Sequence, residues 1–494
     1  MHQVLFATSE LQPLAGTGGL GEVCRALPLA LSGAGCDVRI AVPGYRQVRN
    51  SARSWPVRCK FHLPGSGDAV RILEGRLENS GVVVYVVDIP ELFDRGGGLY
   101  QAEDGMEWPD NINRFAAFSR AVVHLALGQD GLGWQPHVLH CHDWQTGLAC
   151  MLLRDEPRRP ATVFTVHNMA YAGTGDRARF DAIGLPAQLF TPEALEFYGN
   201  FSLLKGGLAG ADLITTVSPS YAQEIQNPEL GFGLDGLLRQ RQAALVGVMN
   251  GVDYQIWDPK SDRHIPRQYN LRSLGRKRNN KLALQNTLGL RESPDAILFG
   301  VVSRLAHQKG IDLLLAAIPA LTDQPVQFAI LADGDPALQQ ALLLAARANP
   351  GRVASASGFN ESLAHQIVAG ADVLVMPSRY EPCGLAQLYA LRYGTVPVVR
   401  NTGGLRDSIV DATSETMAAG TATGIVFQNA TTEALVDALR RALTMFRDKN
   451  AWLRVQKSGM KADFSWNSSA QTYLDIYQRA RAFAPIDHKA PDTA

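Results

Sequence analysis

The feature that constrains this fold most is a rhythm of short, β-branched apolar runs separated by longer helical patterns. The runs lie at residues 2–8, 37–43, 82–88, 138–141, 162–166 and 212–217, and they begin again after residue 251 at 296–303, 326–331, 372–377 and 396–399. Helical patterns near 310–321, 335–348 and 384–393 separate the later runs. This alternation is typical of buried strands in a parallel sheet. The sequence therefore predicts an α/β fold in two halves.

We place the connection between the halves near residues 250–257. The 494 residues exceed the size at which one hydrophobic core keeps growing, and the segment 258–281 is polar, basic and without clear periodicity. A last helix over 465–481 is expected to return to the first half on a broad face carrying Trp466, Tyr473, Ile476 and Tyr477. The predicted parts are an N-terminal domain at 1–250, a C-terminal domain at 251–461, the returning helix at 462–483 and a flexible tail at 484–494.

Charge and cysteine content exclude some classes of function. Lys plus Arg and Asp plus Glu both total 47, so no net field attracts a polyanion and we expect no nucleic-acid partner. The six cysteines form neither a CxxC pair nor a dense framework, which predicts reduced thiols and a cytoplasmic protein. Neither a secretion signal nor an apolar run long enough to span a membrane is recognisable.

A glycine-rich segment, GTGGLG at 16–21, lies between the first predicted strand and a helix starting near Leu20. The spacing of its glycines matches the dinucleotide-binding motif GxGxxG. However, seven residues separate Thr8 from Gly16, and the second strand ends at Val42 and Pro43 rather than at an acid, so NAD binding is disfavoured. Glycines before a helix N-terminus favour a phosphate, and a plain glycine-rich turn is the alternative.

Polar residues follow two predicted strands of the first half. One strand ends in HCHDW at 140–144, where His142 or Asp143 could bind sugar hydroxyls. The alternatives are a metal site at His140 and His142, which has no recognisable third ligand, and Asp143 as a simple helix cap. The next strand ends at His167 and Asn168. Because carboxyl ends of parallel strands share one edge, we expect a shared pocket.

In the second half, two cations follow one strand. Arg304 closes the strand and Lys309 lies five residues on, an arrangement that suits a diphosphate, with a solvated basic turn as the alternative. A later loop, RYEPCGL at 379–385, contains Glu381, which we interpret as a buried carboxylate for sugar hydroxyls or as a helix-capping acid. One strand later, NTGG at 401–404 offers further backbone donors before a helix.

Together these segments resemble the bacterial glycogen synthases and plant starch synthases. The resemblance spans nearly the whole chain and rests on TGGL at 17–20, HCHDW at 140–144, FTVHN at 164–168, TVSP at 216–219, NGVD at 250–253, VSRL at 302–305, QKG at 308–310 and PSRYEPCGL at 377–385. Tyr389 stands where related two-domain glycosyltransferases usually carry a second glutamate. The resemblance implies the GT-B fold: two facing Rossmann-like domains with a deep cleft and a C-terminal helix crossing back.

The same resemblance implies an activity in glycogen biosynthesis. Glucose would pass from ADP-glucose to the non-reducing end of an α-1,4-glucan with retained configuration, without metal or cofactor, by a front-face displacement. Arg304 and Lys309 would contact the donor phosphates, Glu381 the glucose, and Asp143 and His167 the reacting carbon. The remaining substrate-binding residues would be Gly18, Gly19, Asn168, Asn250, Cys383, Gly384, Leu385, Thr402 and Gly403.

One departure from the family pattern lies in the first glycine loop. Gly16 stands where the family normally has a lysine that reaches the donor diphosphate, and Glu22 stands where the bacterial members usually have aspartate. Arg304 and Lys309 could suffice, or Arg25 could substitute. Two alternatives therefore stay open: a related retaining glycosyltransferase using UDP-glucose, and a weakly active protein that binds glucan or nucleotide sugar. An NAD oxidoreductase is a more distant possibility.

Overall fold

The structure is a computed structural model, and it describes residues 2–64, 67–129, 131–358 and 360–483. The chain forms two compact units. Unit 1 comprises Met1–Gly251 and Trp466–Ala494, and unit 2 comprises Val252–Ser465. The tail predicted at 484–494 lies outside the described residues. No helix in the described part of the chain has both the length and the hydropathy to cross a bilayer.

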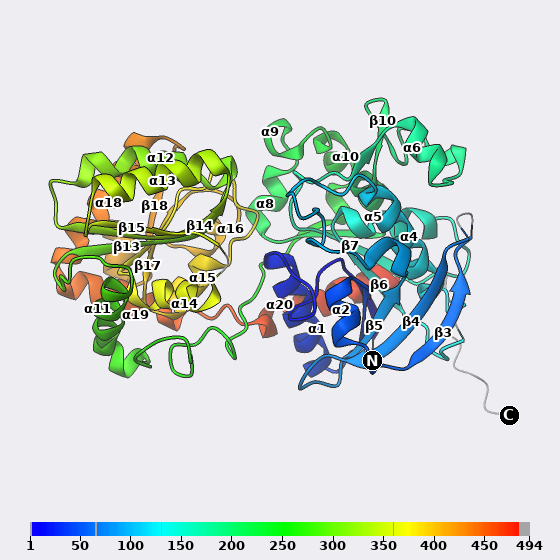
Figure 1. The fold of residues 1–494 in the computed structure, drawn as a ribbon, viewed down its shortest axis with the longest axis horizontal. Coiled ribbons are helices and arrows are strands. Elements are labelled where there is room, and N and C mark those ends of the chain that lie inside the picture. Colours follow the sequence, from blue (N-terminus) through cyan, green and yellow to red (C-terminus); the bar gives the residue numbers. More distant parts are fainter. Residues whose placement is uncertain (1, 65–66, 130, 359, 484–494) are drawn as a thin grey trace. The chain divides into compact units, whose positions relative to one another are not determined.

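Unit 1 is built on a nine-stranded sheet (Figure 1). Its strands, in spatial order, are β12 (Leu245–Gly247), β11 (Leu213–Thr216), β7 (Ala161–Val166), β6 (Val138–His142), β1 (Gln3–Ala7), β2 (Asp37–Pro43), β5 (Val83–Asp88), β4 (Ala69–Arg76) and β3 (Val57–His62). The strands from β12 to β5 run parallel, whereas β4 and β3 pair antiparallel at one end. A separate small sheet contains β8 (Thr174–Gly175), β10 (Asn200–Ser202) and β9 (Glu196–Phe197).

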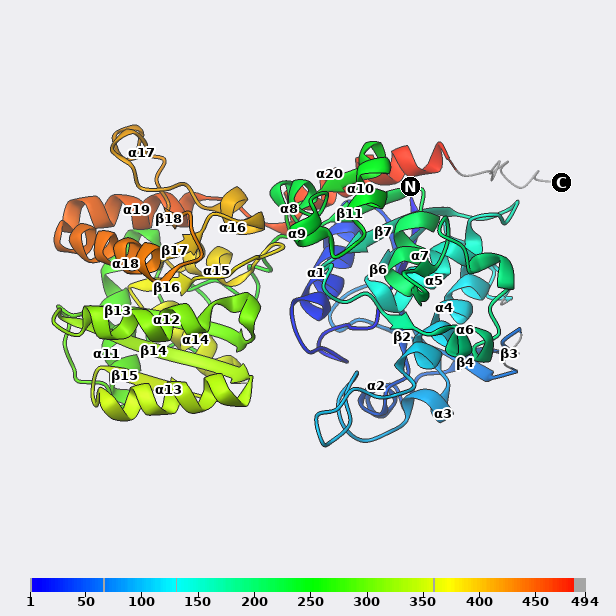
Figure 2. The ribbon, with the colours of Figure 1, turned by 90° about the horizontal axis from the view of Figure 1, so that it is seen from above.

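The helices of unit 1 come from both ends of the chain. They are α1 (Gly19–Gly33), α2 (Arg46–Ser51), α3 (Pro90–Phe93), α4 (Asn111–Ala126), α5 (Trp144–Leu153), α6 (Arg177–Ala182), α7 (Leu203–Gly210), α8 (Pro219–Glu224), α9 (Pro228–Gly231), α10 (Asp235–Gln240) and α20 (Trp466–Arg481). The last of these, α20, packs against α1 and buries Tyr473, Ile476 and Tyr477. In Figure 2 this red helix lies with the blue and green elements of unit 1.

Unit 2 is built on a six-stranded parallel sheet. The spatial order is β15 (Val353–Ala356), β14 (Val326–Gly334), β13 (Ile297–Leu305), β16 (Val373–Met376), β17 (Val396–Arg400) and β18 (Ile425–Phe427). Its helices are α11 (Lys277–Thr287), α12 (Ile311–Ala317), α13 (Pro336–Ala348), α14 (Glu361–Gly370), α15 (Ala386–Arg392), α16 (Gly403–Ser408), α17 (Ser414–Ala419), α18 (Thr432–Arg447) and α19 (Lys449–Lys461).

Alternate residues of β13 explain why helices cover both faces of this sheet. Phe299 and Val301 belong to the core cluster that includes Leu314 of α12. Leu298, which points to the opposite face, packs in a second cluster with Ile367 of α14. Figure 1 shows α12 and α13 on one side of the sheet and α11 and α14 on the other. A strand buried on both faces reads as a continuous apolar run, and this confirms the parallel α/β prediction.

Candidate active site

Both sheets change winding direction beside a central strand. In unit 1, β1 lies between β6 and β2, and in unit 2, β13 lies between β14 and β16. Open parallel sheets bind ligands beyond the carboxyl ends of the strands at such a switch point. In unit 1 these ends lead into Glu10 and Asp143, and in unit 2 they lead into Lys309 and Glu381. Each switch point therefore brings together residues that are far apart in the sequence.

Asp143 follows β6 in an unusual backbone conformation, with φ 56° and ψ −179°. Positive φ is uncommon for a residue other than glycine, and it persists only where the surroundings hold it. Here the N–H of Asp143 donates to the carbonyl of Thr165 at 2.9 Å, and its Oδ1 accepts from the N–H of His167 at 2.7 Å. The side chain makes no capping hydrogen bond to α5 among the described residues, so the helix-cap interpretation of this carboxylate is wrong.

The protonation of Asp143 is tuned by its surroundings. Removal from water raises its pKa to about 7; the N–H of His167 opposes this rise, whereas the nearby charge of Glu10 adds to it. A carboxyl group with a pKa near neutrality exchanges its proton in the range where most enzymes work.

Three histidines lie in a row beside Asp143: His140 and His142 are buried, and His167 is partly exposed. His142 Nδ1 lies 3.0 Å from His167 Nε2, so the two strand ends meet in the structure, whereas the shared pocket stays a prediction. Burial lowers the pKa of His167 to about 3 and holds the pKa values of His140 and His142 well below their usual range. These rings are therefore neutral at physiological pH. His140 contacts Tyr477 at Nδ1 (2.8 Å) and a threonine at Nε2 (2.6 Å), so both of its ring nitrogens are occupied. Nε2 of His142 has no hydrogen-bond partner within the described residues.

Glu10 is a site residue that sequence reasoning missed. It is 4% exposed, and its carboxylate accepts hydrogen bonds from the N–H and Oγ1 of Thr17, at 2.8 and 2.9 Å, and from Tyr100 at 2.9 Å. These bonds fasten the glycine loop, whose Gly18 and Gly19 are exposed at the start of α1. The available signal was a polar segment, TSE at 8–10, directly after the central strand.

The two predicted asparagines lie differently. Asn168 is partly exposed, and its Oδ1 accepts from the N–H of Ala170 at 3.0 Å, which shapes its own turn. Asn250 is 6% exposed where the first segment of unit 1 ends. Within the described residues, no hydrogen bond joins Asn250 to Asp143 or His167. The structure therefore groups Asp143, His167 and Asn168, and does not add Asn250 by direct contact.

In unit 2, Lys309 and Glu381 form a buried ion pair. Lys309 Nζ lies 2.8 Å from Oε1 and 2.6 Å from Oε2 of Glu381, and Ser378 Oγ donates to Oε2 at 3.0 Å. The side chains are only 17% and 6% exposed. The helix that follows, α15, begins at Ala386 after the N-cap Leu385, so Glu381 lies too early to cap it. The capping interpretation of Glu381 and the solvated-turn interpretation of Lys309 are both wrong.

Arg304 occupies a different environment from Lys309. It is exposed near the end of β13, beside Asp333 of β14 in the strand register, whereas Lys309 lies in a single 3₁₀ turn after the strand. Arg304 therefore belongs to the strand and Lys309 follows it, and in the structure Lys309 is directed to Glu381. Its charge is thus already partly balanced.

The backbone around Glu381 is packed tightly against the start of α16. Gly403 has φ 43°, and a Cβ there would lie 2.0 Å from the carbonyl oxygen of Glu381. The N–H of Gly404 donates to that carbonyl at 3.1 Å. Gly384 also has positive φ, 70°, and the buried Thr402 is the N-cap of α16. Gln387 holds the loop from within α15, because its amide donates to the carbonyl of Cys383 at 2.9 Å.

Comparisons with known proteins match this chain over nearly its whole length. The family described as "Starch synthase catalytic domain" matches residues 3–240, and "Glycosyl transferases group 1" matches residues 288–453. The chain is 50% identical to the glycogen synthase of Thioalkalivibrio sulfidiphilus, over 96% of this chain and 99% of that protein. It is 47% identical to glycogen synthase 1 of Methylococcus capsulatus, over 97% of each.

The chain belongs to the glycogen synthase and starch synthase family.

A solved structure of this family supports the same assignment. The catalytic domain of starch synthase IV from Arabidopsis thaliana, bound to ADP and acarbose, superposes with a TM-score of 0.86 at 32% identity, covering 97% of this chain and 99% of that one. Sucrose-phosphate synthase from Thermosynechococcus elongatus, at 18% identity and a TM-score of 0.60, shares the fold. As a member of the glycogen synthase and starch synthase family, the chain is a glucosyltransferase with the GT-B fold.

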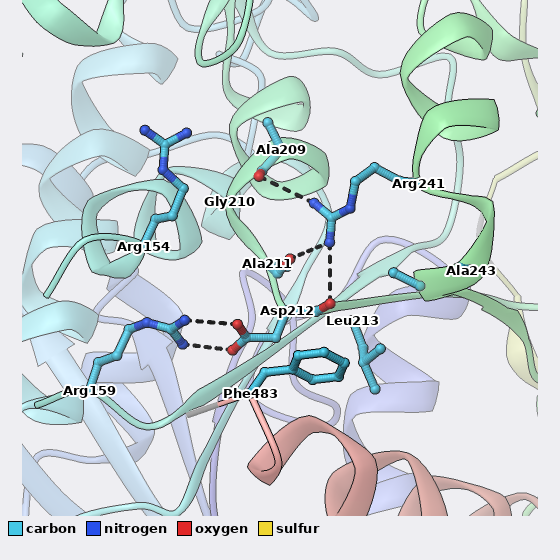
Figure 3. Close-up of a pocket in the computed structure, with 11 residues that line it drawn as sticks. Arg154, Arg159, Ala209, Gly210, Ala211, Asp212, Leu213, Arg241, Ala243 and Phe483 are labelled. Carbon is cyan, nitrogen blue, oxygen red and sulfur yellow. Dashed lines mark hydrogen bonds and ion pairs between the residues drawn. The ribbon is translucent and has the colours of Figure 1, made fainter. Parts of the chain in front are cut away.

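A pocket of about 400 Å³ in unit 1 is lined by none of these candidate site residues, and two of its lining cations, Arg159 and Arg241, have structural roles (Figure 3). Arg159 forms a two-pronged ion pair with Asp212, at 2.6 and 2.8 Å. Arg241 donates to the carbonyls of Leu208 at 2.9 Å and Ala211 at 2.6 Å, at the C-terminal end of α7. These cations therefore satisfy a helix terminus and a buried acid, which accounts for their presence in this glucosyltransferase.

Proposed function

We propose that this chain transfers glucose from ADP-glucose to the non-reducing end of an α-1,4-glucan, with retention of configuration. The observation that carries the proposal is the buried Lys309–Glu381 pair at the switch point of a parallel sheet. The names of the relatives support it: glycogen synthases at up to 50% identity, and a starch synthase solved with ADP and acarbose.

On the donor side, the charged side chains and the backbone groups have separate roles. Arg304 and Lys309 neutralise the diphosphate as it departs, and Glu381 accepts hydrogen bonds from glucose hydroxyls. The backbone of Cys383, Gly384 and Leu385, with Thr402 and Gly403, supplies further contacts. The tight packing of Gly403 on Glu381 fixes these groups before a ligand arrives, which is what efficient electrostatic stabilisation requires.

Asp143 and His167 act at the reacting carbon of the donor glucose. The bond from the anomeric carbon to the diphosphate oxygen breaks with its electron pair going to the phosphate. The acceptor hydroxyl oxygen then bonds to the same face of that carbon, and its proton passes to the departing phosphate oxygen. Asp143 stabilises the positive charge that develops at the carbon, and His167 positions Asp143 through its backbone N–H.

The glycine loop at residues 16–21 supports a second candidate function. Its residue 16 is an exposed glycine rather than a cation, and the nearby Thr17 is held by the carboxylate of Glu10. Donor binding then depends more heavily on Arg304 and Lys309. A protein that binds glucan or nucleotide sugar without fast turnover is therefore the second candidate.

The proposed donor is tested by comparing ADP-glucose and UDP-glucose at equal concentration, with glycogen as the acceptor. Incorporation of labelled glucose into glycogen should be much faster from ADP-glucose. Equal rates, or a preference for UDP-glucose, would overturn the donor assignment while leaving the family assignment intact.

A further inference from the structure

Unit 2 contains a cluster of metal-ligating side chains that the transfer reaction does not use. His264, Glu361 and His365 each offer one ligand atom, and these atoms lie within 4.8 Å of one another. Glu361 and His365 are four residues apart in α14, so one turn of helix places them on the same face. His264 comes from the loop that precedes α11, and its ring centroid lies 4.7 Å from that of His365.

The state of His365 is a second, independent indication of a ligand. Its side chain is fully buried, and Nδ1 lies 2.8 Å from Oδ2 of Asp262. The other nitrogen, Nε2, is also buried and has no hydrogen-bond partner within the described residues. A buried polar atom that lacks a hydrogen-bond partner destabilises the folded chain unless a ligand satisfies it. A metal-bound histidine characteristically holds a carboxylate with its second nitrogen, and this is the arrangement here.

The surroundings also fix the orientation of the candidate ligands. Trp257 stacks on the ring of His365, with centroids 3.7 Å apart and an interplanar angle of 7°. Asp262 contacts both histidines. Its Oδ2 lies beside the ring of His365, and its Oδ1 accepts from the backbone N–H of His264 at 2.8 Å. Tyr393 donates to Oδ2 of the same carboxylate at 2.6 Å. The buried histidine is therefore locked, whereas the exposed side chains of His264 and Glu361 can adjust.

We propose that His264, Glu361 and Nε2 of His365 bind a zinc ion. Two imidazole nitrogens and one carboxylate oxygen form a ligand set that suits Zn²⁺, with water in the fourth position. In a tetrahedral site the ligand atoms are roughly 3.3 Å apart, so the cluster must contract. Rotation of the two exposed side chains supplies this contraction without moving α14.

The zinc site would support the loop at residues 379–385, which contains Glu381, indirectly. Trp257 lies between His365 and Tyr389, and it stacks on Tyr389 with centroids 3.9 Å apart. Tyr389 belongs to α15, the helix that starts directly after the loop containing Glu381. Binding zinc would tie the loop around residue 264 to α14 and stiffen this stack. The role is structural and independent of the proposed transfer chemistry.

The test uses the full-length protein stripped of metal and titrated with Zn²⁺ alone. Wild type should bind one zinc per chain at this site, and zinc should raise the midpoint of thermal unfolding by about 3 °C or more. His264→Ala and Glu361→Gln alter exposed residues, so both variants should fold. Each should fail to bind the zinc ion at this site and should show no zinc-induced rise in the unfolding midpoint. Co²⁺ in place of zinc should give four-coordinate visible absorption in wild type only.

Matched controls separate this site from other exposed acids and histidines. Glu433→Gln changes an exposed acid in the first turn of another helix, and His62→Ala changes an exposed histidine of β3; both should bind zinc as wild type does. Wild type without zinc affinity would overturn the proposal. So would zinc binding and a thermal shift that persist unchanged in both His264→Ala and Glu361→Gln.

Discussion

Lys309 Nζ contacts both carboxylate oxygens of Glu381, at 2.8 and 2.6 Å. The two residues are 72 positions apart in the sequence and meet because β13 and β16 are neighbours in the sheet of unit 2. The pair gives Glu381 a compensating charge in a site that is only 6% exposed. In the proposed mechanism, the donor phosphate would share Lys309 with Glu381.

Replacing Glu381 by glutamine should lower kcat/KM for ADP-glucose by about 10²–10³-fold, because one preorganised electrostatic contact contributes that much. Stability should also fall, since Lys309 would remain largely buried without its partner. Steady-state kinetics and thermal unfolding measure the two effects. The double variant Lys309→Met with Glu381→Gln should recover stability but not activity. Near-normal kinetics in Glu381→Gln would refute the role of this carboxylate.

Ionisation of Asp143 should appear in the pH profile. With its pKa raised to about 7, kcat/KM should rise as pH increases through 7 and the carboxylate forms. The folded chain holds this proton where the unfolded chain, with a pKa of about 3.9, has lost it, so this group's contribution to stability falls between about pH 4 and pH 7. Asp143→Asn should lose activity and both dependences. A wild-type step near pH 7 that survives in Asp143→Asn would assign it to another group.

The contact between Gly403 and Glu381 should be intolerant of a methyl group. Gly403→Ala would place a Cβ 2.0 Å from the carbonyl oxygen of Glu381 and force the loop at residues 379–385 to move. We expect lower stability and a large loss of kcat/KM. Gly420→Ala is the matched control, because Gly420 also has positive φ, 70°, but its Cβ would meet nothing within 4 Å. It should cost about 1 kcal/mol of stability and leave the kinetics unchanged. Equal effects of the two substitutions would argue against the packing explanation.

Restoring a cation to the glycine loop should strengthen donor binding. Gly16 is exposed and its φ lies outside the left-handed region, so the backbone accepts lysine, although Cγ of Gln12, 2.9 Å from the new Cβ, must move. Calorimetry should show tighter ADP binding by Gly16→Lys, with a lower KM for ADP-glucose. Gly16→Gln, of similar length without the charge, should not reproduce the gain. Unchanged affinity in Gly16→Lys would show that the loop does not reach the diphosphate.

The central strands were predictable because burial on both faces leaves continuous apolar runs, as in β13. The missed strands of the two large sheets lie at or next to sheet edges: β3 and β4 are partly exposed, and β12, β15 and β18 are short. The missed strands of the small sheet, β8, β9 and β10, are only two or three residues long. Such strands need less apolar sequence, so their pattern is weak.

The site was predictable in its strand-end residues but not in its pairings. Glu381 and Lys309 could each be singled out, yet their ion pair depends on the strand order β13-β16, which no local pattern encodes. Glu10 was missed because its partners, Thr17 and Tyr100, reach it through a loop and a distant segment. The positive φ of Asp143 likewise comes from tertiary contacts and leaves no trace in the sequence.

The most direct test of the account is transfer itself, measured with the purified chain, labelled ADP-glucose and glycogen. Each glucose incorporated should be matched by one ADP released, the new linkage should be α-1,4, and Glu381→Gln should slow both signals by about 10²–10³-fold. Binding of ADP-glucose and glycogen without incorporation would contradict the proposal and identify the chain as a binding protein of the glycogen synthase and starch synthase family.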